Sequence, residues 1–332
     1  MYYDINRPLS YAQIFNLVFG GRGIGKTYGW KEKAINDFLK KGKQFGYIRR
    51  YETEMNLVKD NLFNDILLNG RFDIKMKLVG NEWLINDEVA GYAFVLSKAK
   101  DYKSSSFPLV SNLLFDEFLI DGGKSGAGGY LKREPFKLLD LYETIARMRN
   151  DVILFMMSNS VSAVNPYFLE WDINLKENKE FTVQNGMLIQ IVKSDSDFVE
   201  AKNNTKFGQI ARQLGYAEYA IDNKFIFDDP IMKQKKGKNA RFYCVFVWKK
   251  KKYGFWFDYS TGNYILSNDY DPLSQLIFTL DKDSINGTIT YLKNYSSHPY
   301  FKKLRDALTS GSLFYESEKI QHELKSMIVL LY

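Results

Sequence analysis

The sequence predicts an α/β protein in which a parallel-sheet domain is followed by a helical linker and a smaller α+β domain. Three observations support this. Short apolar runs alternate with amphipathic segments over residues 14–192, as is typical of buried parallel strands joined by helices. From Ser194 the chain becomes polar and helix-permissive. Beyond Asp228 closely spaced strand patterns separated by turns take over.

The first apolar run, Ile14–Phe19, leads directly into the string GGRGIGKT. A strand, then G-x-x-x-x-G-K-T, then a helix is the pattern of a phosphate-binding P-loop, in which backbone N–H groups and the helix N-terminus face the phosphates. Lys26 is expected to bridge the β- and γ-phosphates of ATP, and Thr27 to coordinate Mg²⁺. The predicted nucleotide-binding residues are Gly20, Gly21, Arg22, Gly23, Ile24, Gly25, Lys26 and Thr27.

Further predicted helices and strands alternate along the chain after the loop. Trp30, Ala34, Ile35 and Phe38 recur at helical spacing and predict a helix over 27–41. The remaining pattern predicts a strand at 44–48, a helix near 52–68, two or three edge or antiparallel strands within 72–96, a strand at 110–115, a helix at 135–148, and strands at 151–157 and 187–192.

An acid pair ends the strand at 110–115, where the chain reads LLFDE. Asp116 is expected to hold Mg²⁺, and Glu117 to polarise the attacking water as general base. Such a glutamate is typical of the ASCE, or RecA-like, class of P-loop ATPases, and it argues against a nucleotide kinase, which should exclude water. Asn159 follows the strand at 151–157 and is expected to contact the γ-phosphate.

Two arginines, Arg147 and Arg149, precede that same strand. Either is a candidate for an arginine finger, which neutralises charge on the transferring phosphoryl group and can come from a neighbouring subunit. The alternative is that they interact with the C-terminal end of the predicted helix at 135–148.

Composition restricts the classes of protein to consider. No apolar run approaches the roughly 20 residues of a membrane span, the N-terminus lacks a signal pattern, and no membrane is expected as a partner. The single cysteine, Cys244, excludes an internal disulfide and suits a core position. The formal charge is +7, and residues 233–252 hold nine basic side chains and no acidic one. That stretch fits either a polyanion-binding surface or two solvated turns.

Several strings resemble the DNA-packaging ATPases of short-tailed picovirus-type phages. They are LSYAQIFNLVFGGRGIGKT, GYIRRYE, LLFDEF, SNSVSAVNPYF, and more faintly KFGQIARQLGYAEYAIDNKFI and DYDP. The resemblance spans nearly the whole chain. It implies three parts: a P-loop ATPase domain over 1–195, a helical linker over 196–228, and an RNase H-like domain without nuclease activity over 229–332.

The resemblance also implies a ring motor, pentameric in that family, which draws double-stranded DNA into a procapsid through the portal protein. It would work in the host cytoplasm at the portal vertex and be absent from the mature virion, with a structural RNA as a further possible partner. By position, Arg147 matches the family's finger residue and Lys103 a lysine that acts across the subunit interface.

The sequence also indicates which residues contact DNA and whether the C-terminal domain has nuclease activity. The family can carry a DNA-directed lysine where this chain has Glu52, so basic contacts are expected instead from Lys124, Lys132 and Arg133, in and after a glycine-rich loop at 122–129. A two-metal nuclease needs clustered carboxylates, and the predicted opening strand RFYCVFVW holds none. Asp258 and Asp269 alone are too few to hold two metals.

A P-loop also occurs in proteins with three other functions. A nucleotide kinase is disfavoured by Glu117 and by the lack of an acceptor-pocket motif. A binding protein with a vestigial P-loop is disfavoured because Lys26, Thr27, Asp116 and Glu117 are all intact. A helicase shares this core, but no strand-separation motif is recognisable in the sequence.

Overall fold

The computed structural model describes residues 3–120, 129–159, 165–173, 179–192, 196–213, 233–293 and 295–331. These residues divide into two compact units. Unit 1 comprises 1–119, 133–161 and 175–226; unit 2 comprises 120–132, 162–174 and 227–332. Two segments that interrupt unit 1 in sequence, 120–132 and 162–174, therefore belong with the C-terminal residues. The predicted domain limits at 195 and 228 remain a prediction.

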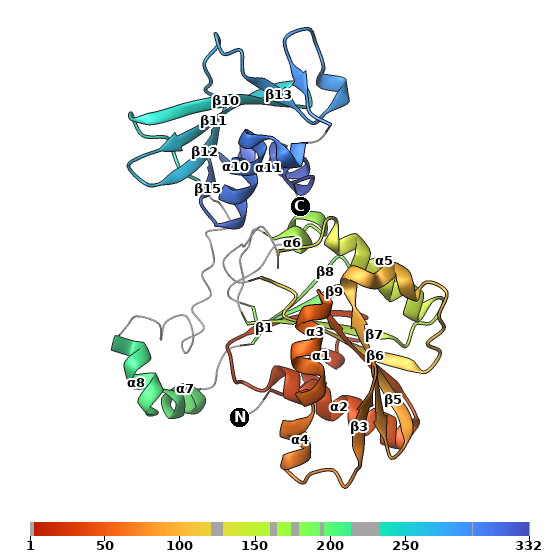
Figure 1. Ribbon diagram of the computed structural model, residues 1–332. Helices are drawn as coiled ribbons and strands as arrows, with labels where there is room; N and C mark the ends of the chain where they lie inside the picture. The colour runs from red at the N-terminus through yellow and green to blue at the C-terminus, as the bar shows by residue number, and fades with distance from the viewer. Residues whose placement is uncertain are drawn as a thin grey trace. The chain divides into compact units, whose positions relative to one another are not determined.

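Unit 1 is built on a mixed sheet whose strand order, among the described residues, is β3-β4-β5-β2-β6-β7-β1-β9-β8 (Figure 1). The strands are β1 (Phe15–Gly20), β2 (Gln44–Arg49), β3 (Met76–Val79), β4 (Glu82–Ile85), β5 (Glu88–Val95), β6 (Val110–Asp116), β7 (Ile153–Ser158), β8 (Phe181–Gln184) and β9 (Met187–Val192). From β5 to β9 neighbouring strands are parallel, and β3, β4 and β8 add antiparallel edges. The predicted parallel core and antiparallel edge are thus confirmed.

Unit 1 also contains helices and short 3₁₀ segments. They are α1 (Asn6–Leu9), α2 (Lys26–Lys41), α3 (Glu52–Val58), η1 (Lys59–Asn61), α4 (Asn64–Leu68), η2 (Leu96–Tyr102), α5 (Glu134–Ala146), α7 (Ser196–Asn203) and α8 (Lys206–Gln213). The single helix expected near 52–68 is instead divided into α3, η1 and α4. Aromatic side chains fill the core on the α2 side of the sheet, where Trp30, Phe45, Tyr47 and Trp83 are almost fully buried and their rings lie in contact.

β7 lies between the P-loop strand β1 and the acid-pair strand β6. This insertion of a strand is the arrangement of the predicted ASCE class. Because β1, β2, β6 and β7 are parallel, the residues that follow each of them share one edge of the sheet. The P-loop, the acid pair and Asn159 therefore meet at the carboxyl edge.

Unit 2 holds a second sheet in the order β14-β13-β10-β11-β12-β15, counted over its described residues. Its strands are β10 (Ala240–Trp248), β11 (Lys251–Asp258), β12 (Asn263–Ser267), β13 (Ile277–Thr279), β14 (Thr290–Tyr291) and β15 (Leu313–Tyr315). The meander β10–β12 is antiparallel, as predicted, and β13 and β14 add in parallel beyond β10. The five strands from β14 to β12 follow the strand order of the expected RNase H-like fold, and β15 adds a sixth strand in parallel beyond β12.

The helices of unit 2 pack on that sheet and complete its core. α10 (Pro299–Thr309) and α11 (Glu318–Val329) pack against the meander, while η4 (Lys282–Ser284) and η5 (Tyr295–Ser297) are short 3₁₀ turns. Cys244 is fully buried in this core, as expected, and burial raises the pKa of its thiol far above the usual range. α6 (Pro166–Glu170) belongs to the same unit, and Asp172 just after it pairs with Lys325 of α11. Among the described helices, none is both long and apolar enough to cross a bilayer.

A buried ion pair fixes the carboxyl edge of the sheet in unit 1. Arg50 follows β2, and its Nε and Nη2 donate to the two carboxylate oxygens of Glu134 at 2.8 and 2.9 Å. The side chains are 3% and 0% exposed. Arg50 also donates to the backbone carbonyls of Phe118, at 2.6 Å, and Glu117, at 3.4 Å. One guanidinium thus connects β2, the turn after β6 and the start of α5.

We expect Glu134→Ala to lower the free energy of unfolding by about 3–5 kcal/mol, because it leaves the Arg50 charge buried without its carboxylate. Urea unfolding followed by tryptophan fluorescence measures this. The double variant Arg50→Met/Glu134→Leu should lose clearly less, since it removes both charges and keeps apolar volume. If Glu134→Ala were at least as stable as the double variant, this role for the pair would be contradicted.

Candidate active site

The P-loop is shaped by glycines at positions that other residues adopt at a cost. Gly23 and Gly25 have φ of 86° and 90°, in the left-handed region that favours glycine. Gly25 is the residue before the first turn of α2, so the loop turns directly into the helix. The helix N-terminus therefore faces the loop, which is the arrangement expected for binding phosphate.

Lys26 is buried beneath this loop and makes three hydrogen bonds. Its Nζ donates to the carbonyls of Gly20 and Gly21, both at 2.8 Å, and to Oδ1 of Asn159 at 3.0 Å. Burial lowers the pKa of Lys26 to about 8, and the negative charge of Asp116 opposes that shift. The structure thus brings together Lys26 and Asn159, which lie 133 residues apart in sequence and were both predicted to contact phosphate.

Thr27 and Asp116 come together as a pair of oxygen donors. The Thr27 hydroxyl donates to Oδ2 of Asp116 at 3.3 Å, and the Tyr47 hydroxyl donates to the same oxygen at 3.3 Å. Burial raises the pKa of Asp116, and the charge of Arg49 counteracts this. A hydroxyl and a carboxylate side by side fit Mg²⁺, which prefers hard oxygen ligands and keeps several waters.

Glu117 projects from a sharp turn directly after β6. Its backbone φ is 54°, which is unusual for a residue other than glycine, and its carboxylate is 53% exposed. Oε2 of Glu117 accepts a hydrogen bond from Nη2 of Arg49 at 2.8 Å, and the Arg49 side chain is 10% exposed. Arg49 was not among the residues predicted for the site. Its position at the end of the strand beside β6 was the signal that could have identified it.

The two finger candidates differ in their surroundings. Arg149 donates to four backbone carbonyls, those of Phe107, Pro108, Val110 and Ile145, at 2.7–3.1 Å. Arg147 is exposed and donates to the carbonyl of Ser105 at 3.1 Å. Arg149 therefore ties the start of β6 to the end of α5, whereas Arg147 lies at the surface beside Met148, which is 97% exposed.

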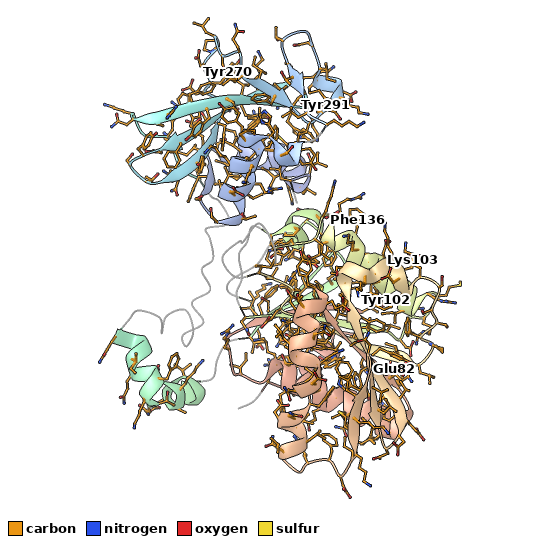
Figure 2. All side chains as sticks on the ribbon, viewed as in Figure 1. Glu82, Tyr102, Lys103, Phe136, Tyr270 and Tyr291 are labelled. Carbon is orange, nitrogen blue, oxygen red and sulfur yellow. The ribbon has the colours of Figure 1, made fainter. Side chains whose placement is uncertain are left out.

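Lys103 lies at the surface of unit 1 beside α5, where its Nζ is 3.5 Å from Oδ2 of Asp140 (Figure 2). Both side chains are about half exposed. Arg147 bonds the loop two residues after Lys103, so these two candidates share one face made by α5 and the segment after η2.

Arg147 lies far from the P-loop of its own chain. It precedes β7, while the P-loop and Asn159 follow the carboxyl ends of β1 and β7. A strand of six residues separates these edges by roughly 20 Å. An arginine side chain cannot span that distance.

The predicted DNA-contacting residues are described in part. Lys132 and Arg133 are exposed just before α5, and the Arg133 guanidinium lies 4.3 Å from the centroid of the Phe136 ring. Lys124 and most of the glycine-rich loop lie outside the described residues. Glu52, at the position where the family can carry a DNA-directed lysine, pairs with Lys98 at 2.6 Å.

The fold and this site define a P-loop ATPase domain of the ASCE class joined to an RNase H-like domain. A protein-family model described as podovirus DNA encapsidation protein (Gp16) matches residues 1–328. The DNA packaging protein of Bacillus phage phi29 is 34% identical over 322 residues, 97% of this chain and 95% of the relative. That of Bacillus phage B103 is 34% identical over 313 residues, 93% and 95% of the two chains. The chain belongs to the podovirus DNA encapsidation protein family.

Solved structures agree with this membership. A chain of the bacteriophage phi29 genome packaging motor assembly superimposes with a TM-score of 0.62 at 34% identity, covering 100% of this chain and 99% of the other. The N-terminal domain of the phi29 DNA packaging ATPase has a TM-score of 0.54 at 38% identity, covering 59% and 98%. The fold is also shared with the Phi-28 gp11 DNA packaging motor, at a TM-score of 0.70 and 22% identity over 99% and 98%. The predicted family, fold class and packaging function are thereby confirmed.

We expect Arg149→Ala to destabilise unit 1 by about 2 kcal/mol, because four carbonyls lose a charged donor. Arg147→Ala should change stability by less than about 0.5 kcal/mol. Urea unfolding of both variants, with Arg149→Lys as a control whose compact ammonium cannot serve all four carbonyls, checks the difference. Equal stability of the two alanine variants would refute this division of roles.

Proposed function

We propose that this chain is an ATP-driven motor that moves double-stranded viral DNA into a preformed procapsid through the portal vertex. The observation that carries the proposal is the convergence of Lys26, Thr27, Asp116, Glu117 and Asn159 at one edge of an ASCE-type sheet, in a chain of the DNA encapsidation family. The motor works in the host-cell cytoplasm at the portal, with the portal protein and DNA as partners.

The site residues have separate roles in hydrolysis. The loop N–H groups and Lys26 bind and orient the phosphates, with Asn159 beside Lys26. Thr27 and Asp116 would hold Mg²⁺, which would supply charge neutralisation for the phosphates. Glu117 accepts a proton from the attacking water. Oε2 of Glu117 accepts the hydrogen bond from Arg49, so this oxygen must leave Arg49 before it can take the proton of the water.

We further propose that each site is completed by a neighbouring subunit in a homo-oligomeric ring of five. Arg147 is the finger and Lys103 acts from the same face, while Arg149 supports the fold. The separation of Arg147 from its own P-loop supports this, because a finger at the amino edge of the sheet is able to reach only another subunit's nucleotide.

DNA is proposed to contact Lys132 and Arg133, with Lys124 as a third basic residue. A motor that moves along any sequence should touch phosphates rather than base edges. The basic stretch 233–252 is the proposed surface for a structural RNA. There, Lys236 lies 4.6 Å from the Trp256 ring and Lys252 lies 5.7 Å from the Tyr270 ring, so cations and aromatic faces occur together.

Unit 2 is proposed to lack nuclease activity. Asp258 is 1% exposed, and its carboxylate accepts hydrogen bonds from the N–H groups of Gly237, at 2.7 Å, and Ser260, at 2.9 Å, and from the Ser260 hydroxyl. These hydrogen bonds hold the pKa of Asp258 below its usual range. Asp269 pairs with Lys236 at 2.7 Å. Both carboxylates are thus engaged in structural contacts.

Glu117→Gln should keep ATP binding and lose at least about 100-fold in hydrolysis, because glutamine cannot accept the proton. Packaging into purified procapsids, ATP turnover and the length of the DNA are measured together. Glu88→Gln, an exposed carboxylate on β5, is the matched control and should behave as wild type. Undiminished turnover by Glu117→Gln would remove Glu117 from its role, and shortened DNA would reveal a nuclease.

Mixing Arg147→Ala with Lys26→Ala subunits should restore ATPase activity that neither variant shows alone. In a randomly mixed ring, roughly a quarter of the interfaces pair an intact P-loop with an intact finger. ATP turnover is measured as a function of mixing ratio, with subunits carrying both changes as the control. Absence of any recovery, with ring assembly verified, would place the finger in the same subunit as the P-loop.

A further inference from the structure

The linker contacts the phosphate loop directly. Nζ of Lys202, in α7, donates to the carbonyl of Arg22 at 3.1 Å, across 180 residues of sequence. Lys26 holds the two preceding carbonyls, those of Gly20 and Gly21. Three successive carbonyls of the P-loop are therefore bonded by two lysines, one from the loop's own helix and one from the linker.

The connection between α7 and α8 is closely packed, so we expect the two helices to move together. A Cβ placed on Gly208 would lie 2.1 Å from the carbonyl oxygen of Lys202, so α8 approaches α7 at backbone distance. The hydroxyl of Thr205 donates to that same carbonyl at 2.7 Å and accepts the Gly208 N–H at 3.0 Å. A displacement of Lys202 is thus passed to the whole helical pair.

The charges around the loop make this contact sensitive to an anion. Lys202 is partly buried, and both that burial and the nearby charge of Arg22 lower its pKa. Arg22 and Lys202 in turn add to the burial that lowers the pKa of Lys26. The three cations therefore repel one another, and a bound polyphosphate would replace that repulsion by attraction to a common anion.

We propose that Lys202 is a positioning residue that fastens the linker helices to the phosphate loop, more tightly with a nucleoside triphosphate bound than with a diphosphate or none. The inference rests on the proposed nucleotide site and adds a conformational output to it. Coupling of this kind is reciprocal, so the triphosphate stabilises the docked linker by the same factor by which Lys202 raises triphosphate affinity.

The consequence for the motor follows from chain connectivity. The linker is the stretch of chain through which residues 1–192 continue into residues 233–331. Loss of the γ-phosphate removes negative charge from the loop, weakens the Lys202 contact and lets α7 and α8 separate from it as a pair. Hydrolysis is thereby converted into a change at the junction that leads to unit 2.

The test uses the full-length protein as wild type, Lys202→Ala, Lys202→Arg and Lys206→Ala, the last a matched control at an exposed lysine of α8. Amide hydrogen exchange of residues 196–213 is followed without nucleotide, with ADP, and with a non-hydrolysable ATP analogue. Affinity for a fluorescent ATP analogue is measured in parallel. In wild type the ATP analogue should slow exchange on the order of fivefold, and ADP should slow it less.

Lys202→Ala should abolish this slowing and weaken affinity for the ATP analogue by the same factor, while Lys202→Arg and Lys206→Ala retain both. Exchange in Lys202→Ala that is faster in every state but slowed equally by the analogue would show a merely structural contact and overturn the proposal. The proposal would also be overturned if the wild-type protein bound the analogue and amide exchange in α7 were not slowed. Wild type that binds no nucleotide would overturn the proposed function and this inference together.

Discussion

The buried pair of Arg50 and Glu134 is the constraint on which the catalytic edge depends. Its guanidinium is held by a fully buried carboxylate and in turn holds the carbonyls of the turn that carries Glu117. That turn has a left-handed backbone at Glu117, a conformation that persists when its surroundings fix it. The adjacent Arg49 pairs with the Glu117 side chain. Neighbouring arginines thus fix the backbone and the carboxylate of one residue.

Parallel pairing places the residues predicted to contact phosphate or metal at one edge of the sheet. β1, β6 and β7 each carry such residues at or directly after their carboxyl ends. Arg147 precedes β7 and lies at the other edge, on a face shared with Lys103. The sheet therefore separates Arg147 from the P-loop, and in the proposed motor the association of subunits would join the two.

The sequence allowed prediction of what depends on local pattern. The P-loop, the acid pair and the apolar strands are each encoded within a few residues, so the parallel core was foreseen, whereas the division of residues 52–68 into α3, η1 and α4 was not. The long-range partners were not foreseen: Arg49 for Glu117, Arg50 for Glu134, and Lys202 for the loop carbonyl. A salt bridge across 84 residues leaves no periodicity or spacing in one sequence, because either partner alone resembles an ordinary surface charge.

Lys26, Glu117 and Lys202 are each engaged by the protein's own groups. Lys26 donates to loop carbonyls and to Asn159, Glu117 accepts from Arg49, and Lys202 holds the carbonyl of Arg22. Each of these hydrogen bonds occupies a group that hydrolysis would need, or a group whose interactions a bound polyphosphate would change. Nucleotide binding must therefore exchange several hydrogen bonds at once, in the loop, in the acid turn and in the linker. An enzyme whose site rearranges in this linked way is suited to convert a chemical step into a movement of its chain.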